Sequence, residues 1–219
     1  MHSIFSTIQG EGPFGGTPAI FVRLYGCNLC CPACDTEYSD HRQAYSTDDL
    51  FQAIYTNSLR NNAPPSLVVF TGGEPMRQNI LPIVQKLLLL TKVQIETNGT
   101  YFSFSLMQSG AHITVSPKTP KIHADWDNIH FVDKENISFK YVLDHLFLDA
   151  FDGLPVDVLR SGLRPARPPA YLESNQIFVQ PIDMKDNDYN DLSLQATVNS
   201  SIQHGYRLSL QIHKIIQLP

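Results

Sequence analysis

The sequence predicts a single α/β domain in which parallel strands form a partial, open (β/α) barrel. A buried strand, a polar loop and a helix follow one another about six times along the chain, and this alternation is typical of parallel sheets covered by helices. A closed eight-fold barrel takes ~250 residues, so a chain of 219 residues favours an open one. In such folds the catalytic residues lie at the carboxyl ends of the strands.

Composition and charge restrict the classes of protein to which the chain can belong. The net charge of −5 argues against a nucleic-acid-binding surface, for which a basic stripe would be expected. No apolar run approaches the ~20 residues of a membrane-spanning helix, and the first residues lack the pattern of a signal peptide. Together with clustered free cysteines, these features predict a cytoplasmic protein that binds neither nucleic acid nor membranes.

The first two predicted strands flank a glycine-rich loop. Residues 3–9 predict a short strand and residues 19–24 a buried one. Gln9 and Glu11 lie among the glycines of the loop, where the backbone can approach a ligand closely, although a flexible turn is the alternative. Arg23 lies inside the second strand, where its charge is costly unless paired. Its planar guanidinium suits a carboxylate, and the alternative is an arginine that reaches solvent at the strand end.

All 4 cysteines of the chain fall within residues 26–36. Neighbouring thiols such as Cys30 and Cys31 would strain a disulfide, so metal ligation or redox chemistry is the better interpretation. The spacing fits two ligand sets, one with Cys31 and one with Cys30 between Cys27 and Cys34. No further Cys/His pair follows at the spacing of a structural zinc site, whereas thiolates of one loop can hold an iron–sulfur cluster. Three thiolates on a four-iron cluster leave one iron open for chemistry. Structural zinc and a redox-sensing thiol loop are the alternatives.

The rest of the chain alternates helices and strands. Helices are predicted over residues 46–58, 78–90 and 188–204, the last of them amphipathic, and strands over residues 66–70, 93–97, 139–143, 177–181 and 207–211 and at the start of residues 112–118. Polar or glycine-rich residues follow several of these strands: TGGEP at 71–75, ETNGT at 96–100, SPK at 116–118 and Gln180. A double glycine lets the backbone approach a ligand, and ordinary turns are the alternative.

Two segments depart from this alternation. Residues 149–175 contain three arginines and several prolines without periodicity. A long unpatterned segment in a compact domain is usually functional or mobile, and the sequence assigns this one no role. Residues 212–219 stay apolar to the last residue, so we expect this tail to be docked on the domain.

The spacing of Cys27, Cys31 and Cys34 resembles that of the radical S-adenosylmethionine (SAM) enzymes. With IQGEG at residues 8–12 and TGGEP at residues 71–75, the chain resembles the 7-carboxy-7-deazaguanine synthase family within them. The resemblance extends from Phe5 to the last residue, except for the unpatterned segment. It implies one compact radical SAM core over residues 1–219, with a partial (β/α) barrel and a C-terminal tail packed on the active site.

The resemblance also implies a carbon–nitrogen lyase of queuosine and 7-deazapurine biosynthesis, a pathway of tRNA modification. In this family a radical from SAM abstracts hydrogen from 6-carboxy-5,6,7,8-tetrahydropterin, and ring contraction gives 7-carboxy-7-deazaguanine and ammonia. The implied cofactors are a [4Fe–4S] cluster, SAM and Mg²⁺. The implied partners are this pterin, an electron donor such as a flavodoxin or ferredoxin, and a second copy of the chain in a homodimer.

The site residues follow from the same resemblance. Cys27, Cys31 and Cys34 would hold the cluster, with Cys30 where the family needs no thiol, and Thr36 would hold Mg²⁺. SAM would be contacted by Gly72, Gly73, Glu74, Thr97, Ser116, Lys118 and Gln180. The substrate would be contacted by Gln9, Glu11, Arg23, Thr71, His213 and Pro219. Two alternatives belong to other classes: a radical SAM activase that installs a glycyl radical on a partner protein, and a zinc-binding interaction module.

Overall fold

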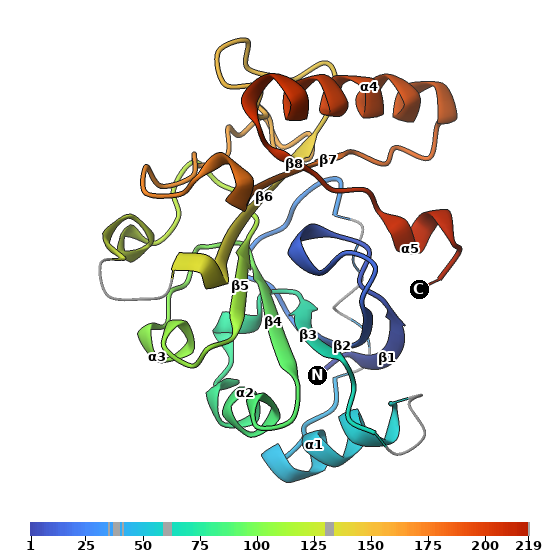
Figure 1. Ribbon diagram of the computed structural model, residues 1–219, viewed down its shortest axis with the longest axis vertical. Helices are drawn as coiled ribbons and strands as arrows, with labels where there is room; N and C mark the ends of the chain where they lie inside the picture. The colour runs from blue at the N-terminus through green and yellow to red at the C-terminus, as the bar shows by residue number, and fades with distance from the viewer. Residues whose placement is uncertain (35, 37–39, 41, 59–62, 130–133, 219) are drawn as a thin grey trace.

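The computed structural model describes residues 1–34, 36, 40, 42–58, 63–129 and 134–218 (Figure 1). Within these ranges one sheet of eight strands runs in chain order, from β1 at one edge to β8 at the other. β1 is antiparallel to β2, and each later strand is parallel to the one before it. The sheet is open between its two edges, and the predicted α/β fold with a partial barrel is confirmed.

The elements lie close to their predicted positions. The strands are β1 (Ser3–Ile8), β2 (Pro18–Leu24), β3 (Leu67–Gly72), β4 (Lys92–Thr97), β5 (His112–Val115), β6 (Ile137–Leu143), β7 (Ile177–Pro181) and β8 (Arg207–Leu208). The α-helices are α1 (Thr47–Thr56), α2 (Leu81–Leu88), α3 (Phe104–Met107), α4 (Asn187–His204) and α5 (Ile212–Ile215). Short 3₁₀ helices are Gly12–Phe14, Pro75–Arg77, Ala124–Asn128, Lys134–Asn136 and Ser174–Gln176. In the described part of the chain, none of the helices has the length and apolar character that crossing a bilayer requires.

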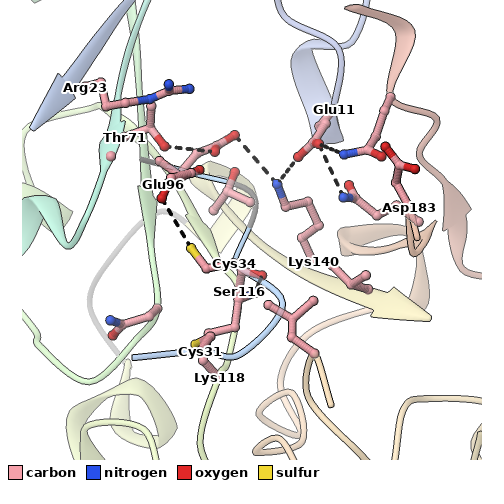
Figure 2. Close-up of a pocket in the computed structure, with 18 of the residues that line it drawn as sticks. Glu11, Arg23, Cys31, Cys34, Thr71, Glu96, Ser116, Lys118, Lys140 and Asp183 are labelled. Atoms are coloured by element: carbon pink, nitrogen blue, oxygen red, sulfur yellow. Dashed lines mark hydrogen bonds and ion pairs between the residues drawn. The ribbon is translucent and has the colours of Figure 1, made fainter. Parts of the chain in front are cut away.

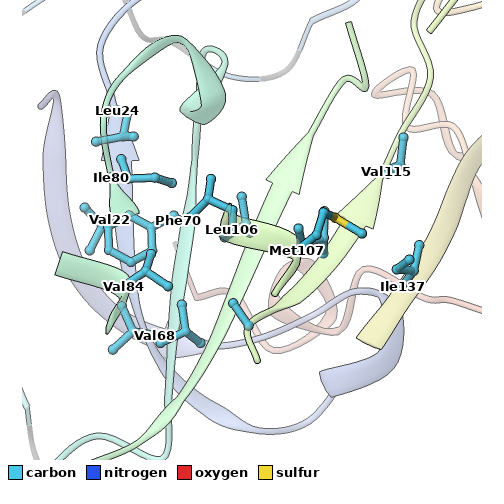
Figure 3. Packing of buried hydrophobic residues seen from close by; sticks show 14 of the residues in the cluster. Val22, Leu24, Val68, Phe70, Ile80, Val84, Leu106, Met107, Val115 and Ile137 are labelled. Atoms are coloured by element: carbon cyan, nitrogen blue, oxygen red, sulfur yellow. The ribbon is translucent and has the colours of Figure 1, made fainter. Parts of the chain in front are cut away.

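An apolar core joins the sheet to the helices on its outer face. Val22 and Phe70 are fully buried on neighbouring strands, and Val84 of α2 packs in the same cluster (Figure 3). Burying a side chain of this kind contributes about 1.5–3 kcal/mol relative to leaving it exposed. Because this core occupies the outer face, the opposite face and the carboxyl ends of the strands are left to form a site. The Gly12–Phe14 turn contacts β6 across that inner face.

The buried face of α4 is not apolar, which corrects the predicted amphipathic pattern. Ser193, Thr197 and Ser200 are its buried residues, whereas Ile202 is 79% exposed. Small side chains let α4 approach β7 closely, and their hydroxyls are bonded: Thr197 Oγ1 donates to the Ser193 carbonyl at 2.7 Å, and Ser200 Oγ donates to the Gly153 carbonyl at 2.8 Å. The buried hydroxyls are thus satisfied within α4 and by Gly153 of the 149–175 segment, and small polar residues take the place of an apolar stripe.

Candidate active site

The carboxyl ends of the parallel strands and the inner face of the sheet surround a cavity of about 330 Å³. It is closed by the loop after β1, the cysteine loop after β2 and the chain around α5. The predicted site residues that line it are Gln9, Glu11, Arg23, Cys27, Cys31, Cys34, Thr36, Thr71, Gly72, Gly73, Thr97, Ser116, Lys118, Gln180 and His213. Glu74 is not among the lining residues, and Pro219 lies outside the described residues.

The cysteine loop presents three thiols to this cavity. Cys27, Cys31 and Cys34 line it, whereas Cys30 is exposed and is not among the lining residues. All four thiols are free of disulfides. Burial raises the pKa of the Cys31 thiol, and the positive charge of Lys118 offsets part of this rise. This placement favours the ligand set of Cys27, Cys31 and Cys34 over the set that includes Cys30.

These thiols fit an iron–sulfur cluster. Three free cysteines of one loop that face one cavity are the donor set that such clusters use. Among the described residues, no three His, Cys, Asp or Glu side chains are gathered as they would be around a single metal ion.

Gly72 and Gly73 make room for the cysteine loop. A Cβ on Gly73 would lie 1.9 Å from the carbonyl oxygen of Gly26, and one on Gly72 would lie 2.4 Å from the backbone of Leu24. In the close contact that results, the backbone N–H of Gly73 donates to the Leu24 carbonyl at 3.1 Å, and that of Glu74 donates to the Gly26 carbonyl at 2.9 Å. The double glycine thus allows the loop after β3 to pack closely against the cysteine loop. It can also allow a ligand to approach the backbone, as the sequence predicted.

Glu74 lies fully buried beside the cavity and joins three loops. Its carboxylate accepts hydrogen bonds from the backbone N–H groups of Met76 at 2.9 Å and Asn98 at 2.8 Å, and from the Thr97 hydroxyl at 2.8 Å. Burial raises the pKa of this carboxyl, and the three donors oppose the rise. The Asn98 amide in turn donates to the Cys27 sulfur at 3.9 Å. Glu74 therefore positions the residues around the cysteine loop, and its own oxygens are occupied.

A charge cluster occupies the other end of the cavity (Figure 2). Lys140, in β6, has a side chain only 8% exposed; it is ion-paired with Glu11, and its Nζ lies 3.9 Å from Glu96. Burial opposes ionisation of Glu11, but the charge and hydrogen bond of Lys140 outweigh it and lower the pKa of Glu11 to about 2. Gln211 and Gln180 also donate to Glu11 Oε1, at 2.9 and 3.3 Å. This end of the cavity thus holds two carboxylates around one ammonium group.

Comparison with known proteins identifies the family. No protein-family model matches the chain. The chain is 37% identical to the 7-carboxy-7-deazaguanine synthase of Rhodospirillum rubrum, an alignment that covers 100% of this chain and 92% of that protein. It is also 37% identical to the 7-carboxy-7-deazaguanine synthase of Rickettsia prowazekii, covering 99% and 87%. The chain belongs to the 7-carboxy-7-deazaguanine synthase family.

A solved structure agrees with this assignment. The crystal structure of QueE from Escherichia coli matches the chain with a TM-score of 0.65 and 26% sequence identity, over 96% of this chain and 92% of that one. The family, the enzyme and the queuosine-pathway radical SAM function predicted from the sequence are confirmed. Membership of the 7-carboxy-7-deazaguanine synthase family also implies a [4Fe–4S] cluster and SAM.

The sequence-based prediction missed Lys140, and it included Glu96 only as part of the ETNGT turn at residues 96–100. Lys140 is a charged residue inside an apolar strand, the same anomaly that singled out Arg23, and this signal could have found it. Glu96 ends the apolar part of β4 and accepts a hydrogen bond from the Thr71 hydroxyl at 3.4 Å. The sequence shows that Glu96 lies at a strand end. It does not show that Glu96 pairs with Lys140, which lies 44 positions later.

Other predicted residues support the same end of the cavity. Gln9 is only 1% exposed, and its amide donates to Gln94 at 2.7 Å and to Glu96 at 3.2 Å. The guanidinium of Arg23 lies over the Phe5 ring, 5.3 Å from its centroid. Gln9 therefore orients a carboxylate, while Arg23 brings a positive charge to the cavity wall.

Gln180 and the residues after β5 complete the wall. Gln180 is 4% exposed, and its side-chain carbonyl oxygen has no hydrogen-bond partner among the described residues. A buried acceptor of this kind is costly unless a ligand supplies a donor. Lys118 donates to the Ser116 hydroxyl at 2.5 Å, on the side of the cavity near Cys31.

Only the start of the tail, Ile212 and His213, lies against the loop after β1; Ile215 and Leu218 are 67% and 41% exposed, so the docking predicted for residues 212–219 is limited to its first residues. A Cβ on Gly10 would lie 1.9 Å from His213 Nδ1, so the glycine is required for this contact. The N–H of Ile212 donates to the Gly10 carbonyl at 3.2 Å, and Lys214 forms an ion pair with Asp183 at 2.8 Å. His213 and Lys214 thereby line the cavity on the side of the charge cluster.

Proposed function

We propose that this cavity converts 6-carboxy-5,6,7,8-tetrahydropterin to 7-carboxy-7-deazaguanine and ammonia. Cys27, Cys31 and Cys34 would hold the [4Fe–4S] cluster, with SAM beside it and the pterin at the charge cluster. When bound, the reduced cluster supplies the electron that cleaves SAM and so provides the radical that takes hydrogen from the substrate. The chain's own residues bind the two ligands, orient them and exclude water.

The observation that carries this proposal is the pairing of two unlike groups in one cavity. Three free thiols lie at one end and the carboxylate–lysine cluster of Glu11, Lys140 and Glu96 lies at the other. Radical chemistry requires the organic substrate to lie close to the source of the radical. A cavity that joins the two ends meets this requirement without a large rearrangement.

The residues nearest the cysteine loop are the proposed SAM contacts. They are Gly72, Gly73, Thr97, Ser116 and Lys118, and Gln180 would join them from the charge-cluster end; all six line the cavity. The unpartnered carbonyl of Gln180 supports this assignment, because a ligand N–H or O–H group would satisfy it. For Glu74 we propose a positioning role, since its oxygens already accept three hydrogen bonds.

The charge cluster is the proposed site for the pterin ring. The side-chain oxygens of Glu11 and Glu96 can accept hydrogen bonds from the adjacent N–H donors of such a ring, and those to the ionised Glu11 carboxylate are of the stronger, charge-assisted kind. Arg23 would bind the substrate carboxylate through its planar fork. Gln9 would orient Glu96, and Thr71 and His213 would contact the ring. Pro219, outside the described residues, stays a predicted contact.

The remaining parts of the proposal rest on the family alone. Mg²⁺ prefers hard oxygen ligands and keeps several waters, and Thr36 brings one hydroxyl-bearing side chain to the cavity wall. A flavodoxin or ferredoxin as electron donor, a homodimer and a cytoplasmic location complete the proposal.

An anaerobic assay with reconstituted protein tests the reaction and the ligand set together. SAM, Mg²⁺, dithionite and the pterin are added, and 7-carboxy-7-deazaguanine and ammonia are measured. We expect product with the unmodified chain and with Cys30→Ser, and none with Cys31→Ala. A brown protein that cleaves SAM but leaves the pterin unchanged would overturn the substrate and favour the glycyl-radical activase. A colourless protein that binds zinc would overturn the cluster.

A further inference from the structure

We propose that Leu159 and Arg160 hold the cysteine loop in position, which gives the unpatterned 149–175 segment a role. The two residues lie in a turn formed by residues 157–163, here called the 157–163 turn. This inference rests on the proposed cluster at Cys27, Cys31 and Cys34. Arg160 is then a positioning residue, because Arg160 acts on the cluster ligands only through Leu159.

Leu159 contacts the cysteine loop directly. Its carbonyl oxygen accepts a hydrogen bond from the backbone N–H of Ala33 at 3.3 Å. Ala33 lies between Cys31 and Cys34 in the sequence, so this bond restrains the backbone between two of the three proposed ligands. Leu159 and Ala33 also line the same cavity, so the 157–163 turn forms part of the wall beside the thiols.

The backbone of this turn is strained at the point of contact. Leu159 has a φ of 47° and Arg160 a φ of 61°, in the left-handed region that residues other than glycine seldom adopt. Such a conformation costs free energy and persists only where the surroundings fix it. The N–H of Val158 donates to the Leu163 carbonyl at 2.8 Å, and that of Ser161 donates to the Val158 carbonyl at 2.9 Å. These bonds close the turn, but they do not attach it to the sheet.

Arg160 provides that attachment. Its guanidinium donates to Asp144 Oδ2 at 3.2 Å and to the Tyr189 hydroxyl at 2.5 Å, and it lies 5.1 Å from the centroid of the Tyr189 ring. The Tyr189 hydroxyl donates to the other oxygen of Asp144. Asp144 is 5% exposed and directly follows β6, and Tyr189 lies in the first turn of α4. The strained turn is thus bound to two elements of the fold.

The other two arginines of the segment make a different kind of contact. Arg164 pairs with Asp149, and Arg167 pairs with Asp152 at 2.7 Å. Both partners lie inside the 149–175 segment itself, which is drawn from yellow to orange in Figure 1. These pairs fold the segment on itself, whereas Arg160 connects it to the sheet and α4. Arg164→Ala is therefore a matched control for Arg160→Ala.

Loss of the reconstituted cluster provides the first test. The unmodified protein, Arg160→Ala, Arg160→Lys and Arg164→Ala are exposed to an iron chelator, and the visible absorbance of the cluster is followed. Arg160→Ala should lose its cluster about tenfold faster, because a charge-assisted hydrogen bond no longer opposes local opening of the loop. Arg160→Lys should recover part of the protection, and Arg164→Ala should match the unmodified protein. Equal rates in all four proteins would overturn the proposal.

Thiol alkylation in the metal-free protein tests the turn without the cluster. Exposed Cys30 serves as an internal reference for half-buried Cys31. We expect Arg160→Ala, and to a lesser degree Tyr189→Phe, to raise the alkylation rate of Cys31 relative to Cys30 with little change in the midpoint of thermal unfolding. An unchanged ratio, or a rise matched by Arg164→Ala, would overturn the proposal. If the unmodified protein bound no iron but the ratio rose as expected, the proposed function would fail and the contact of the turn with the loop would stand.

Discussion

The two ends of the cavity are built in different ways. At the thiol end, backbone meets backbone: Gly73 lies so close to Gly26 that even one added carbon atom does not fit. At the other end, side chains meet from distant parts of the chain, and Glu11 accepts hydrogen bonds from Lys140 and from Gln211, which is 200 residues away. The thiol end is therefore sensitive to added volume, and the substrate end is sensitive to removed charge.

The largest effect should follow from removing the buried charge. Lys140→Met leaves Glu11 and Glu96 buried without their cation, and breaking a buried pair in this way costs about 3 kcal/mol of unfolding free energy. Displacing the two carboxylates should also lower turnover about 100-fold. Chemical denaturation and the pterin assay measure the two losses.

A surface lysine provides the control for this variant. Lys86 pairs with Asp48 at 2.5 Å, but the side chains are 37% and 83% exposed. Lys86→Met should change stability by less than about 1 kcal/mol. Equal losses in the two lysine variants would mean that burial of the Glu11–Lys140 pair has no special importance.

Adding one carbon at the thiol end should have the next largest effect. Gly73→Ala forces the cysteine loop away from β3, at a cost of about 2 kcal/mol, and should reduce the iron content after reconstitution while leaving the charge cluster intact. Gly15→Ala is the matched control, because its Cβ would meet only ordinary contacts at 3.5 and 3.8 Å. Full iron content in Gly73→Ala would contradict the close contact.

Acid should reduce the stability that the charge cluster gives to the substrate end. The folded-state pKa of Glu11 is about 2, below its ordinary value of 4.5, so its pairing stabilises the protein fully above about pH 4.5 and is lost as the pH falls through the folded-state value. In Lys140→Met the same carboxyl is buried without a cation, so protonation should relieve it. The stability difference between the two proteins should therefore narrow from about pH 5 to about pH 3. A constant difference over this range would show that Glu11 is not the group affected.

The smallest effect should come from one neutral hydrogen-bond donor. Gln211→Ala removes a donor to Glu11 Oε1, and we expect the KM for the pterin to rise about fivefold with an unchanged kcat. Gln203→Ala, at an exposed position of α4, should leave both constants unchanged. A fall in kcat instead would place Gln211 in the chemical step.

The thiol end could be predicted from the sequence more completely than the substrate end. Its groups follow successive parallel strands in chain order, so Cys27, Gly73 and Thr97 reach one edge of the sheet as soon as the strands are recognised. The substrate end depends on which side chains face each other across the sheet. Periodicity places Lys140 in a strand, but it does not show that the loop after β1 crosses to it.

The unpatterned segment shows a further limit of sequence-based prediction. Nothing in the composition of residues 149–175 shows which arginine finds a partner inside the segment and which finds one outside it. Asp144 precedes the segment and Tyr189 lies beyond it, so the contacts of Arg160 appear only when β6 and α4 are placed. The buried face of α4 was not predicted for a related reason. Its buried residues are small and carry hydroxyl groups, which allow close approach to the sheet but give no apolar pattern in the sequence.

The wide separation between Glu11 and Gln211 has a consequence for the order in which the protein matures during synthesis. A chain that leaves the ribosome from its first residue releases the cysteine loop and β3 early, so Gly26 and Gly73 can meet while much of the chain is still unmade. Leu159 reaches the cysteine loop later, and Tyr189 later still. Gln211 and His213 emerge last. The backbone contact at the thiol end can therefore form before the residues that close the substrate end have been made.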